Sequence, residues 1–158
     1  MRTSEAHDST FAAALRALRA TRAVVDLDAI AGNVKALRSA VAPGTCMMAI
    51  VKADGYGHGA IEVAQAALEA GAECLGVATV SEGRELRAHG IAAPILILGS
   101  LEPAEAAAAV QAELQITIAD FPLLAAVQEA ARRPGAPVPV SVQLKIELYD
   151  DITWSGWQ

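Results

Sequence analysis

The chain has 158 residues, of which 54% are hydrophobic and 19% are charged, and its mean hydropathy is +0.36. This length and composition predict one folded domain with a sizeable core and exclude a disordered chain. The net charge of −6 and the isoelectric point near 5.0 argue against nucleic acid or an anionic membrane as a partner.

The first 22 residues predict a short amphipathic helix that leads into the domain. Phe11, Leu15 and Leu18 recur at helical spacing and would lie on its inward face. A transit peptide is the alternative, but two acidic residues near the start count against it, and there is no apolar secretory core. No stretch of the chain approaches the roughly 18 apolar residues that a membrane-spanning helix needs.

From Ala23 onward, apolar segments of strand length alternate with amphipathic segments of helix length. The predicted strands are residues 23–27, 47–52, 74–79, 94–98, 115–119 and 138–147. The predicted helices are one capped by Asp28 that ends before Pro43, one from about 60 to 71, one from about 81 to 90, one from 103 to about 114, and one capped by Asp120 that finishes at Arg133.

Alternating strands and helices of this length predict a parallel sheet with right-handed crossovers. Two forms of such a sheet are possible, an open doubly wound sheet and a (β/α)8 barrel. A complete barrel typically needs about 250 residues, so length alone favours the open sheet. A sequence motif in the second predicted strand outweighs this argument and favours the barrel.

The motif is a lysine at the end of an apolar strand. Lys52 closes the segment 47–52 and is followed by Ala53-Asp54-Gly55-Tyr56-Gly57-His58-Gly59. A charged amine at the end of a buried strand is costly, because desolvation disfavours its ionised form. Such a lysine is often one whose neutral amine is used, for example to form a Schiff base. The tyrosine hydroxyl and the glycine backbone could supply what a phosphorylated aldehyde needs.

Simpler interpretations of the same residues remain open. A lysine at a strand end is often a surface residue whose apolar stem packs on the protein. The three glycines could form only a tight turn, and they fit neither G-x-G-x-x-G nor a Walker A loop, so nucleotide binding is weakly supported. His58 is expected to make local hydrogen bonds rather than to act as a catalytic base.

Residues 52–59 resemble the pyridoxal-phosphate attachment signature of alanine racemases. Residues 24–34, 76–99 and 144–146 resemble further parts of the same family in the expected order, so the likeness covers roughly residues 22–146. The resemblance implies the N-terminal part of an alanine racemase, and therefore an incomplete (β/α)8 barrel of the TIM type. About six βα units with parallel strands are expected.

The resemblance also implies an activity and a cofactor. Lys52 would hold pyridoxal 5'-phosphate as an internal aldimine and serve as one of two bases that exchange the Cα proton of alanine. Tyr56 would lie near the cofactor phosphate. Lys145 matches a family lysine that is carbamylated in some members and helps position an arginine. The implied enzyme is a cytoplasmic isomerase, a homodimer at full length, that makes D-alanine for peptidoglycan precursors.

The likeness fails near the end of the chain. Residues 147–158 depart from the family pattern, contain both tryptophans and lack the arginine expected after Ile146. The expected plan is therefore a leader helix over 1–22, the racemase barrel portion over 23–146, and a tail foreign to the fold. The family's C-terminal β-domain, with the tyrosine that serves as second base, has no counterpart here. The truncated chain alone is expected to be inactive.

Three alternatives to an alanine racemase stay open. The first is a racemase for serine or for several amino acids, and the second is a non-catalytic pyridoxal-phosphate-binding barrel. The third is a non-functional remnant of a gene. The two cysteines, Cys46 and Cys74, form no C-x-x-C pair and have no histidine at metal-ligand spacing, so no metal is expected. Both are expected to be reduced core residues.

Overall fold

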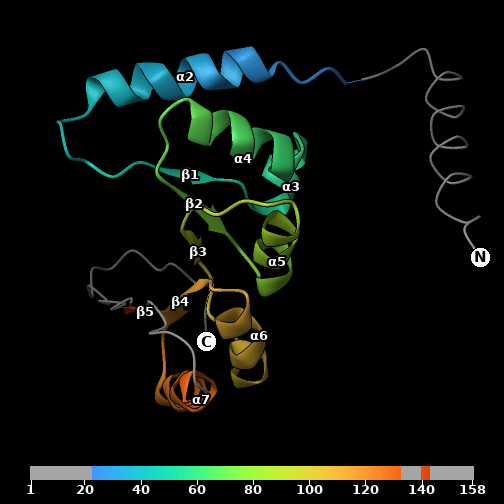
Figure 1. Ribbon diagram of the computed structural model, residues 1–158, viewed down its shortest axis with the longest axis vertical. Helices are drawn as coiled ribbons and strands as arrows, with labels where there is room; N and C mark the ends of the chain where they lie inside the picture. The colour runs from blue at the N-terminus through green and yellow to red at the C-terminus, as the bar shows by residue number, and fades with distance from the viewer. Residues whose placement is uncertain (1–22, 133–139, 143–158) are drawn as a thin grey trace, which may run out of the picture.

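A computed structural model describes residues 23–132 and 140–142 of the chain (Figure 1). The expected leader helix over 1–22, Lys145 and the tail over 147–158 lie outside the described residues. The helices are α2 (Leu27–Ala40), α3 (Lys52–Gly57), α4 (Ala60–Glu69), α5 (Val80–Ala88), the 3-10 turn η1 (Pro103–Glu105), α6 (Ala106–Gln111) and α7 (Phe121–Ala131). The strands are β1 (Met48–Ile50), β2 (Cys74–Val77), β3 (Ile95–Ile97), β4 (Gln115–Ile118) and β5 (Val140–Val142).

The strands form one sheet in the order in which they occur in the chain. All neighbouring strands are parallel, and the order is β1-β2-β3-β4-β5. Each crossover therefore moves one strand further in the same direction, whereas a doubly wound sheet reverses its direction part of the way through. Figure 1 shows α4, α5 and α6 following one another along one side of the strands. The fold is thus part of a (β/α)8 barrel, which confirms the predicted class and excludes the open doubly wound sheet.

The core lies between the strands and the helices that cover them. All four residues of β2 are buried, as expected for a strand with neighbours on both sides and helices over it. The largest fully buried side chains come from the strands, from the connections next to them and from helices α5 and α7: Val51, Leu75, Val77, Leu86, Ile95, Ile97, Leu114, Ile116 and Leu123. The apolar runs that predicted the second to fifth strands therefore supply most of this core.

The first predicted strand, over 23–27, is wrong. Asp26 caps α2 because its Oδ1 accepts a hydrogen bond from the Ala29 backbone N–H at 2.9 Å, so the helix begins at Leu27. Asp28, the predicted cap, lies in the first turn. Val24 is 79% exposed, and no residue of α2 is buried. The described residues therefore contribute five strands to the sheet rather than six.

Helices α5 and α7 each begin directly after a residue whose side chain caps the helix. Asp120 caps α7 as predicted, with its Oδ1 2.8 Å from the Leu123 N. Thr79, rather than Ser81, caps α5, and it forms a capping box with Glu82. The predicted helix over 103–114 is shorter and divides into η1 and α6, and Leu114 lies beyond its end, fully buried against the core.

Arg87 ties α5 to the loops beside it. Its guanidinium donates to the backbone carbonyls of Ile91 at 2.6 Å, Ala93 at 2.8 Å, Glu113 at 3.1 Å and Ala112 at 3.2 Å. Burial lowers the pKa of Arg87. Because the four carbonyls come from two separate loops, this side chain joins the loop between α5 and β3 to the loop between α6 and β4. None of the helices in the described part of the chain is long and apolar enough to cross a membrane.

Candidate functional site

Lys52 leaves the sheet at the carboxyl end of β1. β1 ends at Ile50, the next residue Val51 is 1% exposed, and its N–H donates to the Gly76 carbonyl at 2.9 Å. Lys52 itself is half-buried, and its Nζ lies 6.0 Å from the centre of the Tyr56 ring. The amine is therefore less enclosed than the sequence predicts, but it lies at the end of the sheet where (β/α)8 barrels carry their functional groups.

Residues 52–57, which make up α3, form a left-handed turn that we call the lysine turn. Ala53, Asp54, Gly55 and Tyr56 have φ between 52° and 60° and ψ between 37° and 50° within α3. For residues with a side chain this conformation costs roughly 1–2 kcal/mol each, so it persists only where the surroundings hold it. Tyr56 is 59% exposed on this turn. The turn thus carries both predicted cofactor residues, Lys52 and Tyr56, on one strained and well-held segment.

Asp54 and Gly55 fix the turn against α4. The Asp54 Oδ1 accepts a hydrogen bond from the Ala60 N at 2.8 Å, and the Asp54 carbonyl accepts one from the Gly59 N at 2.9 Å. Gly55 is buried, and a Cβ there would lie 3.4 Å from the Ala60 Cα. Asp54 therefore caps α4 from six residues away, a role that the sequence analysis missed.

Glu82 connects the lysine turn to the next βα unit. Its Oε1 accepts a hydrogen bond from the Ala53 N at 2.9 Å. Its Oε2 accepts from the Ala78 N at 2.7 Å and from the Thr79 N at 3.3 Å. One carboxylate thus joins three backbone N–H groups from the lysine turn, the end of β2 and the start of α5. The spacing of Thr79 and Glu82 could have predicted the helix cap, but no local signal predicts the bond to Ala53.

The remaining residues of the motif have local roles. The His58 Nδ1 lies 3.0 Å from the Gly55 carbonyl oxygen and 3.1 Å from the Tyr56 carbonyl oxygen, which confirms the prediction of local hydrogen bonding. Gly57 and Gly59 have φ of 81° and 91°, a backbone region that favours glycine. The glycine pattern therefore marks a turn whose glycines are required by its geometry.

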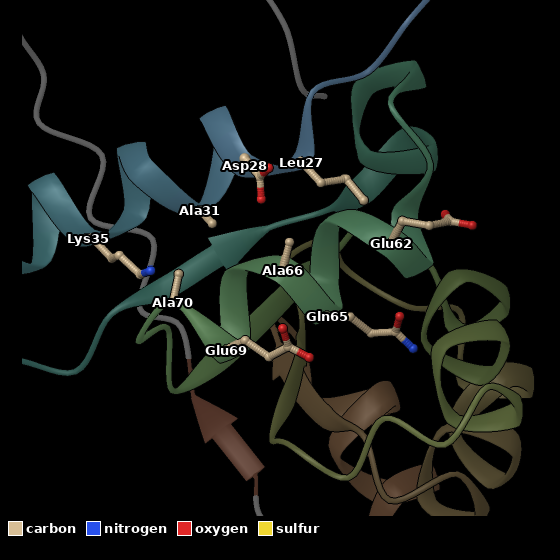
Figure 2. A pocket seen from close by; sticks show the side chains of 9 residues that line it. All are labelled: Leu27, Asp28, Ala31, Lys35, Glu62, Gln65, Ala66, Glu69 and Ala70. Atoms are coloured by element: carbon tan, nitrogen blue, oxygen red, sulfur yellow. The ribbon is translucent and has the colours of Figure 1, made fainter.

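A cavity of about 410 Å³ lies away from Lys52, between α2 and α4. Figure 2 shows side chains from both helices lining it, with Asp28 and Ala31 from α2 facing Ala66 from α4 and Ala70 just after that helix. Its lining combines charged and polar side chains with alanines and Leu27, and Lys52 and Tyr56 take no part in it. Across residues 23–132 and 140–142, no three histidine, cysteine, aspartate or glutamate side chains gather as a metal site.

The sequential parallel sheet and the lysine turn at the carboxyl end of β1 define a partial (β/α)8-barrel protein with a lysine at the end of the sheet where such barrels carry their functional groups. The profile of the family described as "Alanine racemase, N-terminal domain" matches residues 25–148. The chain belongs to the alanine racemase family, and the matched residues lie in the N-terminal domain of that family. The resemblance found from the sequence is thereby confirmed.

Individual relatives agree with this assignment. An alanine racemase of Symbiobacterium thermophilum is 48% identical over 121 residues, which are 77% of this chain and 32% of that protein. One from Geobacillus stearothermophilus is 46% identical over 129 residues, with 82% of this chain and 32% of that protein covered. The solved alanine racemase from Streptomyces coelicolor A3(2) matches with a TM-score of 0.71 and 40% identity, over 77% of this chain and 32% of that one. The chain therefore spans about a third of the length of these relatives.

Proposed function

We propose that Lys52 is the cofactor-attachment residue of a pyridoxal-phosphate-dependent alanine racemase, and that this chain is the lysine-bearing part of that enzyme. The observation that carries the proposal is the position of Lys52, half-buried at the carboxyl end of β1 on a turn held by Glu82 and Asp54. Membership of the family and the names of the relatives support alanine as the substrate.

The residues on the turn fit the cofactor. Lys52 offers a primary amine on a half-buried side chain, and Tyr56, a residue that is 59% exposed, offers a hydroxyl group on the same turn. Lys52 would hold the cofactor through its amine, and Tyr56 would lie at the phosphate. When bound, pyridoxal phosphate withdraws electrons from the substrate Cα and thereby makes its proton acidic. The Lys52 amine then accepts or returns that proton on one face of the substrate.

Racemisation requires a base on each face of the Cα, and Lys52 supplies one of them. Because the chain spans about a third of the relatives' length, we propose that the second base and further cofactor contacts come from residues beyond these 158. At full length we propose a cytoplasmic homodimer that supplies D-alanine for peptidoglycan precursors. Comparing L-alanine with L-serine as substrates of that enzyme would separate an alanine racemase from a racemase of broader specificity.

A titration of the purified chain with pyridoxal phosphate tests attachment. We expect a saturable absorbance band from the cofactor joined to a protein amine, and we expect the band to be absent in Lys52→Ala. The matched control is Lys35→Ala, which removes a lysine from the cavity between α2 and α4 and should leave the band unchanged. An unchanged band in Lys52→Ala, in protein whose circular dichroism matches the parent, would refute the proposal.

A further inference from the structure

We propose that Cys46 and Cys74 form a thiol pair that closes to a reversible disulfide, a redox modification site at the amino ends of β1 and β2. They are the two cysteines of the chain, and their Sγ atoms lie 3.7 Å apart. The expectation that both are core residues is wrong for Cys46, which is exposed, whereas Cys74 is buried. The proposal is independent of the proposed enzymatic function.

The geometry allows the bond with a small movement of one side. A disulfide has an S–S distance of about 2.0 Å, so the two sulfur atoms need to approach each other by roughly 1.7 Å. Cys74 is the first residue of β2 and is 8% exposed, so its position is fixed by the sheet. Cys46 lies in the segment before β1 that has no helix or strand, so it can supply the movement.

Several contacts keep the two cysteine-bearing segments together. The Met47 carbonyl accepts hydrogen bonds from the Glu73 N at 2.9 Å and the Cys74 N at 3.4 Å. The Met47 N donates to the Glu73 Oε2 at 2.6 Å. Arg38 reaches from α2 to both segments, because it donates to the Thr45 carbonyl and pairs with Glu73 at 3.5 Å. The sulfur atoms are therefore neighbours through a network of contacts rather than through a chance approach of two side chains.

The difference in exposure sets the order of the two chemical steps. The Cys46 thiolate attacks one sulfur of a small-molecule disulfide such as oxidised glutathione, and the first thiol leaves with the proton from Cys46. The Cys74 thiolate then attacks the Cys46 sulfur, and the second thiol leaves with the proton from Cys74. The two cysteines lose two electrons in total, which reduce the small disulfide to two thiols. Burial, followed by the neighbouring Cys46 and Glu73, raises the pKa of Cys74 to about 11. Because the thiolate is the reactive form and little of this thiol is ionised near neutral pH, Cys74 is the slower nucleophile.

The bond would close a covalent loop around residues 46–74, which include β1, the lysine turn and α4. In the part of the sheet that the structure describes, β1 pairs with β2 alone. A link between the amino ends of these two strands would hold that pairing in place and restrict the unfolded chain. Because the strands are parallel, the link lies at the opposite end of the sheet from Lys52 and leaves its amine accessible.

Incubation of the full chain with oxidised glutathione, followed by intact mass and peptide mapping, tests the pair. We expect a product lighter by the mass of two hydrogen atoms, with a Cys46–Cys74 cross-link, a higher Tm than the reduced chain, and return of both thiols with dithiothreitol. The cross-link should form several-fold faster under native conditions than in concentrated urea, because the fold brings the sulfur atoms together. Equal rates in the two conditions, or a stable glutathione adduct without the cross-link, would overturn the proposal.

Two variants test the order of the steps. In Cys74→Ser, the glutathione adduct on Cys46 should accumulate, because no second thiol is present to displace it. In Cys46→Ser, the buried Cys74 should react many-fold more slowly under native conditions. Reaction of Cys74 in Cys46→Ser as fast as that of Cys46 in Cys74→Ser would contradict the assigned roles. The parent chain decides the proposal even if a variant fails to fold.

Discussion

One carboxylate, that of Glu82, holds the backbone beside the candidate cofactor lysine. It accepts hydrogen bonds from the N–H groups of Ala53, Ala78 and Thr79. Carboxylates bind backbone N–H groups more strongly than neutral acceptors do, and both oxygens are used here. The side chain of Lys52 therefore depends for its position on a residue that belongs to the next βα unit. Glu82 is a positioning residue in this account, since it acts through the turn.

Glu82→Gln should weaken both the fold and the attachment of the cofactor. The amide replaces one acceptor oxygen by a donor that faces backbone N–H groups, so we expect unfolding free energy to fall by about 1–3 kcal/mol. Urea denaturation measures this loss, and the absorbance titration should show weaker binding of pyridoxal phosphate. The control is Glu85→Gln, an exposed position on the same helix, with a change within about 0.5 kcal/mol. A loss no larger than that of the control would contradict the role of Glu82.

Cys74 should make the fold sensitive to alkaline pH. Burial, followed by the neighbouring Cys46 and Glu73, raises the pKa of Cys74 from 9.0 to about 11. The unfolded thiol ionises first as pH rises, so this contribution to stability is complete below about pH 9 and is lost as the pH approaches 11. Urea midpoints of the reduced chain across that window should fall less steeply in Cys74→Ala than in the parent. Parallel curves for the two proteins would refute the assignment.

At the scale of the elements, the lysine turn illustrates what the sequence could and could not predict. The glycines at 55, 57 and 59 indicated a turn, and the structure has one. The left-handed conformation of Ala53 and Tyr56 could not be predicted, because neither residue prefers it and distant contacts hold it. Glu82 makes one of these contacts from 29 residues away, a separation at which no local pattern acts.

Asp54→Ala should destabilise the junction between the turn and α4. The substitution removes the Oδ1 that accepts from the Ala60 N at 2.8 Å, and loss of a helix cap costs about 0.5–2 kcal/mol. Asp54→Asn keeps an acceptor oxygen and a residue that tolerates positive φ, so it should retain most of the stability. Thermal denaturation of the two variants measures the difference. Equal losses in alanine and asparagine would mean that the cap contributes nothing.

The strands and helices differ in how well they could be predicted. The predicted strands over 74–79, 94–98 and 115–119 each contain an observed strand, because short apolar runs between polar turns suit buried parallel strands. The segment 23–27 has the same pattern but forms no strand. There a single aspartate, Asp26, bonds to a backbone N–H three residues later and starts a helix instead. Local capping of the helix therefore outweighs the strand preference of the short apolar run at that position.

At the scale of the molecule, the strand order decided between two architectures that the sequence left open. Length favoured an open doubly wound sheet, whereas the motif favoured a barrel. The order β1-β2-β3-β4-β5 never reverses, which is the arrangement of a barrel wall. Strand order depends on which strands pair across the sheet, and periodicity within a segment does not report it. The family resemblance supplied the correct answer where the physical pattern alone did not.

The 158-residue polypeptide with pyridoxal phosphate and L-alanine should yield no D-alanine at ordinary enzymatic rates, which are about 1–1,000 per second. In the proposed mechanism Lys52 provides a base on one face of the Cα, whereas inversion needs one on each, and we propose that the second base comes from residues beyond these 158. A coupled assay with D-amino-acid oxidase measures the product, and a complete relative of the family serves as the positive control. Turnover within the enzymatic range would show that the chain has a second base.

The proposed function depends above all on the amine of Lys52, which we propose bonds to the cofactor aldehyde. Borohydride reduction of the chain with pyridoxal phosphate, followed by digestion and mass spectrometry, tests it most directly. We expect the reduced adduct on the peptide that contains Lys52, at a yield far above those on Lys35 and Lys145. An adduct located mainly on another amine, or spread evenly over the three lysines, would refute the assignment of Lys52.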